Sequence, residues 1–160
     1  MATPSVEDLV SRMQAALTPL EAERSRWVLE TEFSPNQALR PGADEVVRLV
    51  SRGLDDASQP GLTESWELLG QMAAGAFGPT TADERVVQEV RLALREAGAA
   101  AMLRASSAAP MAYDFLAVDV IDALLAEADG PLRARYRDAL QRFAQRGPRE
   151  AKRVRTVFEA

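Results

Sequence analysis

The 160-residue chain contains no histidine and no cysteine. These two side chains most often serve as general base, nucleophile or zinc ligand near neutral pH. Their absence excludes disulfides, thiol redox chemistry and a di-iron site of the usual Glu-x-x-His kind. We therefore expect no catalytic residues, no metal site and no cofactor, and a binding protein or scaffold rather than an enzyme.

Long apolar runs are also missing. No stretch approaches the roughly 20 apolar residues that span a bilayer. The N-terminus has no basic segment followed by an apolar one, as a secretory signal would. We expect a cytoplasmic protein without membrane contact. The alternating, β-branched pattern of strands is absent as well, which predicts an all-α fold without a sheet.

Charge is unevenly distributed along the chain. Residues 131–160 contain nine basic and three acidic side chains and carry a charge of +6. Because the net charge of the chain is −5, residues 1–130 carry −11. An acidic body disfavours nucleic acid and favours a basic partner through electrostatic steering. The basic segment has two interpretations: it binds phosphate, or it docks on the acidic body.

Helix starts and breaks are well marked. Ser5 is a plausible N-cap, and Thr18-Pro19-Leu20-Glu21 has the form of a capping box with proline at the first helical position. Thr63 and Thr81 are expected to cap later helices, and the alanine-rich stretch 99–104 either follows a stop at Gly98 or extends the helix before it. Seven or eight helices are expected, at residues 5–17, 19–33, 43–56, 64–77, 82–97, 111–128, 132–145 and 149–158, the last being basic.

The breaks group six of these helices into antiparallel pairs at 19–56, 64–97 and 111–145. The pairs start near Thr18, Thr63 and Pro110, at intervals of 45 and 47 residues. Two-helix repeats of the HEAT and armadillo kind recur at roughly 40–47 residues. Because one such pair cannot bury its apolar face alone, we expect stacked pairs in a single domain over residues 1–160.

Two segments carry a resemblance to HEAT-like helical-repeat proteins. Residues 66–75 (WELLGQMAAG) and 115–125 (FLAVDVIDALL) both read like the aliphatic, Leu-Leu and small-residue helix of those repeats. The resemblance implies a short HEAT-like solenoid, and similar small bacterial proteins include immunity proteins that block a cognate toxin. An orthogonal helical bundle with coincidental spacing is the alternative architecture.

The aromatic residues Trp27, Trp66, Tyr113 and Tyr136 are sparse, and at helical spacing we expect them in the core. Paired carboxylates are the only catalytic material in quantity: Asp55 with Asp56, Asp83 with Glu84, and Asp119 with Asp122. Asp119 and Asp122 lie one helical turn apart, but nothing supplies the further oxygen ligands that a hard cation needs. We read these acids as solvated.

Helix 111–128 carries the candidate binding site. In a projection at about 100° per residue, its apolar residues fill one broad arc, whereas Phe115 and Val118 fall among the acids. Either Phe115 packs on a neighbouring repeat, or it is an apolar anchor ringed by carboxylates. The predicted partner-binding residues are Asp114, Phe115, Val118, Asp119 and Asp122.

These patterns favour a stoichiometric protein-binding protein. The most specific expectation is a bacterial immunity protein that covers the active or substrate-binding surface of a toxin domain with a basic surface. The alternative is a helical adaptor in a larger complex or homodimer, docking through the arginine-rich terminal helix. The third hypothesis is an enzyme that acts through carboxylates alone.

Overall fold

The computed structural model describes residues 3–56, 58–79 and 82–159. Throughout these ranges the regular structure is helical and no strand occurs, which confirms the all-α prediction. The chain divides into two compact units, residues 1–97 and 98–160. Within the same described ranges, no helix is both long and apolar enough to cross a membrane.

The first unit begins with two helices whose N-caps were predicted. Ser5 closes a capping box with Asp8, and the Thr18 hydroxyl accepts a hydrogen bond of 3.2 Å from the Glu21 N–H. The Glu21 carboxylate accepts from the N–H of Leu17, one residue before the expected donor. The elements of this unit are α1 (Val6–Gln14), α2 (Pro19–Phe33), the 3₁₀ helix η1 (Pro35–Gln37), α3 (Ala43–Arg52), α4 (Leu62–Phe77), α5 (Glu84–Leu94) and the 3₁₀ helix η2 (Arg95–Ala97).

Two of the expected caps need comment. Thr63 lies inside α4, because this helix begins at Leu62, directly after Gly61. Gly61 packs so closely on the backbone of Met13 that a side chain there would collide, and its N–H binds the carbonyl of Gln14. Contact with the end of α1 therefore sets the start of α4. Thr81 lies outside the described residues; α5 is capped by Asp83, whose side chain accepts from the Arg85 N–H.

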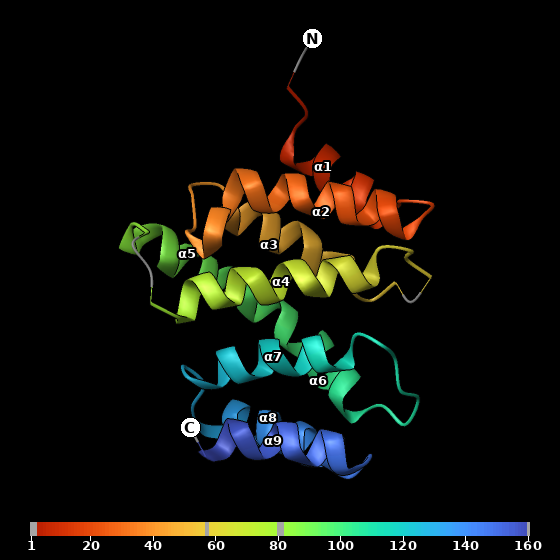
Figure 1. Ribbon diagram of the computed structural model, residues 1–160. Coiled ribbons are helices and arrows are strands. Elements are labelled where there is room, and N and C mark those ends of the chain that lie inside the picture. Colours follow the sequence, from red (N-terminus) through yellow and green to blue (C-terminus); the bar gives the residue numbers. More distant parts are fainter. Residues whose placement is uncertain (1–2, 57, 80–81, 160) are drawn as a thin grey trace. The chain divides into compact units, whose positions relative to one another are not determined.

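The packing in the first unit differs from the predicted pair 19–56. Helix α2 packs on α1 and α4, whereas α3 packs mainly on α5 and α1, as Figure 1 shows. The pair 64–97 is present as the contact between α4 and α5. The loop after α2 accounts for the difference, because η1 returns to α4 before the chain enters α3. Helices α2 and α3, which follow each other in the chain, are therefore not nearest neighbours in space.

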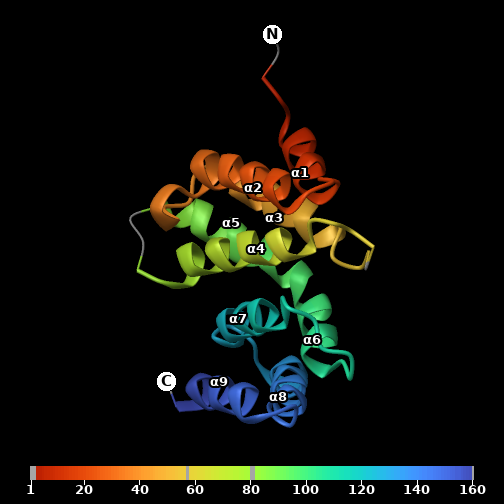
Figure 2. The ribbon, with the colours of Figure 1, turned by 45° about the vertical axis from the view of Figure 1, so that its right-hand side comes forward.

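The second unit contains α6 (Gly98–Ser106), α7 (Asp114–Leu125), α8 (Gly130–Ala144) and α9 (Pro148–Glu159). The alanine-rich stretch thus forms a helix of its own. It begins at Gly98, where a side chain would collide with the Tyr136 hydroxyl group. Helix α6 packs on both α7 and α8, and Figure 2 shows α8 and α9 side by side. Helices α7 and α8, the predicted pair 111–145, touch less extensively than either does with α6.

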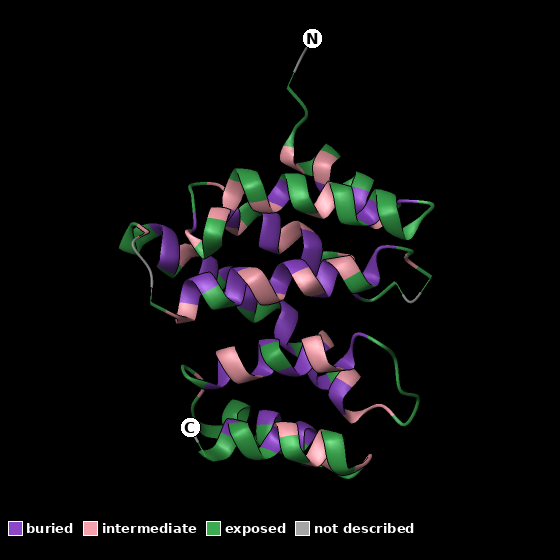
Figure 3. Cartoon of the chain, in the orientation of Figure 1, coloured by how far each residue is buried: buried purple, intermediate pink, exposed green. Residues whose placement is uncertain are grey.

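Burial varies strongly between helices, as Figure 3 shows. Most of α4 is buried, including Trp66, whereas α2 buries only Ala22 and Leu29. Tyr113 and Tyr136 are buried, as expected for core aromatics. Trp27 is not: it projects from α2 into solvent, and the expectation of a core position for it is wrong.

Candidate functional site

Asp114, predicted to lie on an exposed acidic face, is buried at the start of α7 and only 1% exposed. Its carboxylate accepts hydrogen bonds from Arg104 Nε at 2.9 Å and from Arg146 Nη1 at 2.6 Å. Arg104 Nη2 donates a third at 3.2 Å, and the backbone N–H of Met111 donates a fourth at 2.8 Å. Two arginines therefore hold this carboxylate inside the second unit, and the prediction that Asp114 contacts a partner is wrong.

The two apolar members of the predicted site also face inward. Val118 is fully buried. Phe115 is half-buried and meets the Phe143 ring edge-on, with 5.1 Å between ring centroids. The Arg149 guanidinium lies 5.5 Å from the centroid of the Phe115 ring. The structure thus places Phe115 against α8 and α9. The residue is packed rather than a free anchor, but Phe143 belongs to the same predicted pair 111–145 and not to a neighbouring repeat.

Asp119 and Asp122 are partly exposed but are joined by one arginine from α9. Arg153 Nη2 lies 2.8 Å from Asp119 and 3.0 Å from Asp122. Desolvation lowers the pKa of Arg153, but the hydrogen bonds and charges of both aspartates outweigh it and leave the pKa raised. Arg153 therefore stays charged, and part of the basic C-terminal segment neutralises acids of its own unit.

The remaining carboxylate pairs form no common site. Within the described ranges, no three Asp or Glu side chains lie together in a group that could hold a metal ion. Asp56 lies in a turn and accepts hydrogen bonds from the hydroxyl and N–H of Ser58, which lower the pKa of Asp56. Asp83 is occupied as the N-cap of α5. These roles are structural.

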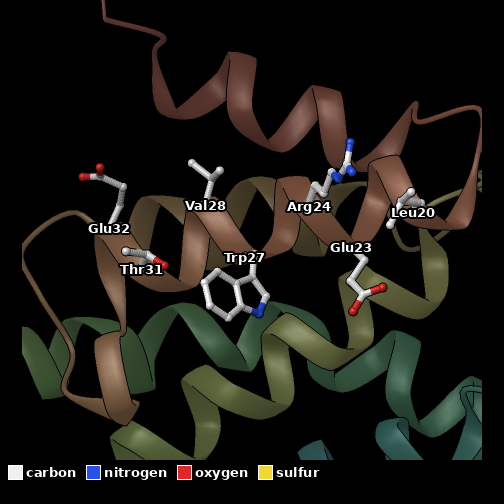
Figure 4. A pocket seen from close by; sticks show the side chains of 7 residues that line it. All are labelled: Leu20, Glu23, Arg24, Trp27, Val28, Thr31 and Glu32. Carbon is white, nitrogen blue, oxygen red and sulfur yellow. The ribbon is translucent and has the colours of Figure 1, made fainter.

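In the first unit, the outward face of α2 exposes large apolar side chains. Exposed fractions are 54% for Leu20, 65% for Trp27 and 46% for Val28. An open groove of about 670 Å³ lies along this face, and Figure 4 shows the side chains that line it, all of which come from α2. We call it the α2 face; it is lined by Leu20, Glu23, Arg24, Trp27, Val28, Thr31 and Glu32.

The helix periodicity accounts for this exposure. Residues seven apart, such as Leu20 and Trp27, lie on nearly the same side of a helix. Ala22 and Leu29, also seven apart, occupy the opposite side and are buried against the rest of the unit. Helix α2 therefore carries apolar side chains on both sides, a pattern typical of a helix that is covered on both.

Sequence reasoning missed the α2 face because each aromatic was assigned to the core by its type. A projection of residues 19–33 contains the signal, since Leu20 and Trp27 oppose Ala22 and Leu29. Comparisons of the chain with models of protein families, with characterised proteins and with solved structures find no match.

Proposed function

We propose that the chain acts by stoichiometric binding of another protein and that the α2 face contacts this partner. The observation that carries the proposal is the exposure of Trp27 together with Leu20 on an ordered helix. Contiguous exposed apolar surface of this kind commonly marks an interaction site. Tryptophan is also the residue type most enriched among interface hot spots. The proposed role includes no catalytic step and no cofactor.

The charge around the α2 face supports a basic partner. Glu23 and Glu32 line the groove on an exposed surface, and Arg24 is the one basic side chain among the groove's lining residues. The first unit as a whole contains 16 acidic and nine basic residues and carries −7. Such a field accelerates association with a basic protein and repels nucleic acid.

The class of partner that we propose is a toxin domain with a basic surface, neutralised in the cytoplasm by an immunity-type complex. The acidic charge of the first unit and the resemblance of residues 66–75 and 115–125 to HEAT-like repeats support this choice. Relative to the prediction from sequence, the contact surface moves from α7 to α2, while the chemistry of the partner stays the same.

Site-specific photo-cross-linking tests the proposal. A benzophenone amino acid replaces Leu20 on the α2 face or, as a matched control, Leu103 on α6, which is also an exposed leucine. In cells that make the protein, we expect the Leu20 probe to give a single one-to-one adduct with a basic protein. The Leu103 probe should give none, and Trp27→Asp should abolish the adduct.

The complex should then be isolated at a one-to-one ratio, with an association rate that falls as salt rises. Adducts from both positions alike, or none from Leu20, would contradict the proposal. An adduct between two copies of this chain would favour the homodimer alternative instead.

A further inference from the structure

A second, polar pocket opens beside Trp27, where α2 ends and η1 begins. It has a volume of about 450 Å³ and lies next to the groove of the α2 face, because Trp27 and Thr31 line both. We call it the α2-end pocket. Apart from Trp27 and Pro35, its walls are Glu30, Thr31, Ser34, Asn36, Gln37 and Gln71.

The charge beside this pocket is negative. Glu30 is the one ionisable residue among its lining residues. Arg26 binds Glu30 at 2.6 Å but also binds Glu64, so one guanidinium faces two carboxylates and a net charge of −1 remains. Desolvation lowers the pKa of Arg26, yet the bonds to Glu64 and Glu30 outweigh it and leave the pKa raised. Proton loss from Arg26 therefore does not alter this balance near neutral pH.

The pocket also holds unused hydrogen-bonding capacity. Gln37 donates from its side-chain amide to that of Gln71 at 3.3 Å, which leaves the Gln37 amide oxygen available.

The backbone at the mouth of the pocket is strained. Asn36 and Gln37 have φ angles of 53° and 64°, in the left-handed region that non-glycine residues rarely adopt. Asparagine adopts this region more readily than most residues, so the strain lies mainly at Gln37, and such strain concentrates at binding sites. The strain here places two amide-bearing residues beside an exposed indole.

We propose that the α2-end pocket binds the guanidinium group of an arginine on the protein partner; this inference rests on the function proposed above. A guanidinium is planar and stacks on the face of an indole such as Trp27. Its five N–H donors suit the acceptors that line the pocket, which are the Glu30 carboxylate and side-chain amide oxygens. An anion would meet Glu30 with no cation among the lining residues.

Nuclear magnetic resonance with the full chain and N-acetyl-L-arginine amide tests the assignment. N-acetyl-L-citrulline amide is the matched probe, because it has nearly the same shape without the charge. We expect the arginine compound to shift the indole N–H signal of Trp27 and the side-chain amide signals of Asn36, Gln37 and Gln71. The citrulline compound should bind about tenfold more weakly or not at all.

Two variants localise the effect. Glu30→Gln keeps an acceptor for Arg26 but removes the charge, and should weaken binding of the arginine compound about tenfold. Glu45→Gln makes the same change at an exposed residue of α3, outside both the pocket and the α2 face, and should leave binding unchanged. Equal binding of both compounds, or arginine-induced shifts confined to other acidic surfaces, would overturn the inference.

The two proposals fail separately. If the Leu20 probe captures a protein whose cross-linked surface presents no arginine, the inference about the pocket falls while the proposed function stands. If no protein is captured, the proposed function falls, whatever the small compounds do.

Discussion

The Asp114 carboxylate and the Arg146 guanidinium lie 2.6 Å apart, although 32 residues separate them in the chain. This pair joins the start of α7 to the end of α8, and Arg104 adds the end of α6 through the same carboxylate. A residue predicted to face solvent is thus the polar centre of the second unit. Its removal should therefore affect the stability of this unit.

Asp114→Ala is expected to destabilise the second unit strongly. Removing one partner of a buried ion pair leaves the opposite charge uncompensated and typically costs about 3–5 kcal/mol. Urea unfolding followed by circular dichroism measures the change. Asp138→Ala is the control, because Asp138 pairs with Arg142 on an exposed surface and should contribute less than about 1 kcal/mol. Similar losses for the two variants would contradict the structural role of Asp114.

Trp27→Ala should leave the free energy of unfolding within about 0.5 kcal/mol of the parent value, as for most exposed positions. Trp66→Ala should cost about 3–5 kcal/mol, because Trp66 is 1% exposed and its truncation leaves a cavity. Acrylamide quenching separates the two residues: the signal that remains in Trp66→Phe should be quenched readily, and that in Trp27→Phe poorly. The reverse order would refute the α2 face.

Phe115→Ala is expected to destabilise the protein by about 2 kcal/mol, below the 3–5 kcal/mol of a fully buried aromatic because the ring is half-buried. The loss arises because Ala lacks the edge-on ring contact with Phe143 and the contact with the Arg149 guanidinium. Partner capture by the Leu20 probe should be unchanged per folded molecule. A loss of capture without a change in melting temperature would indicate that the partner contacts α7, as predicted from the sequence.

Arg153→Gln should cost about 1 kcal/mol at low salt, a modest amount because Asp119 and Asp122 remain partly exposed. The loss should shrink as salt rises, since screening already weakens these pairs in the parent protein. Arg155→Gln makes the same change at an exposed position of α9 and should have no effect on melting. Equal shifts from both variants would mean that only net charge matters.

Local signals predicted the helices well, and tertiary contacts explain the failures. Ser5 and Thr18 cap their helices as expected because capping involves residues within one turn. Thr63 does not, because the close approach of Gly61 to α1 sets the start of α4. The burial of Asp114 depends on Arg104 and Arg146, which lie 10 and 32 residues away in the chain. Neither arginine is on the helix of Asp114, so the periodicity of that helix does not reveal these contacts.

The α2 face was within reach of sequence reasoning, whereas the α2-end pocket was not. Periodicity alone separates Leu20 and Trp27 from Ala22 and Leu29. The pocket instead requires the left-handed backbone of Asn36 and the approach of Gln71 from α4, which are set by the fold.

Arg146 has a consequence for how the second unit opens. Its Nη2 group donates to the carbonyl oxygens of Arg104, Ala105 and Ser107, at the end of α6, where carbonyls lack the N–H four residues later that would bind them in the middle of a helix. Helix ends normally fray independently, which lets their amides exchange with solvent early. Here the last turn of α6 can unfold only when its carbonyls lose their hydrogen bonds to Arg146, which lies about 40 residues later in the chain. The ends of α6 and α8 should therefore behave as one cooperative unit, with hydrogen-exchange rates that rise together rather than in sequence.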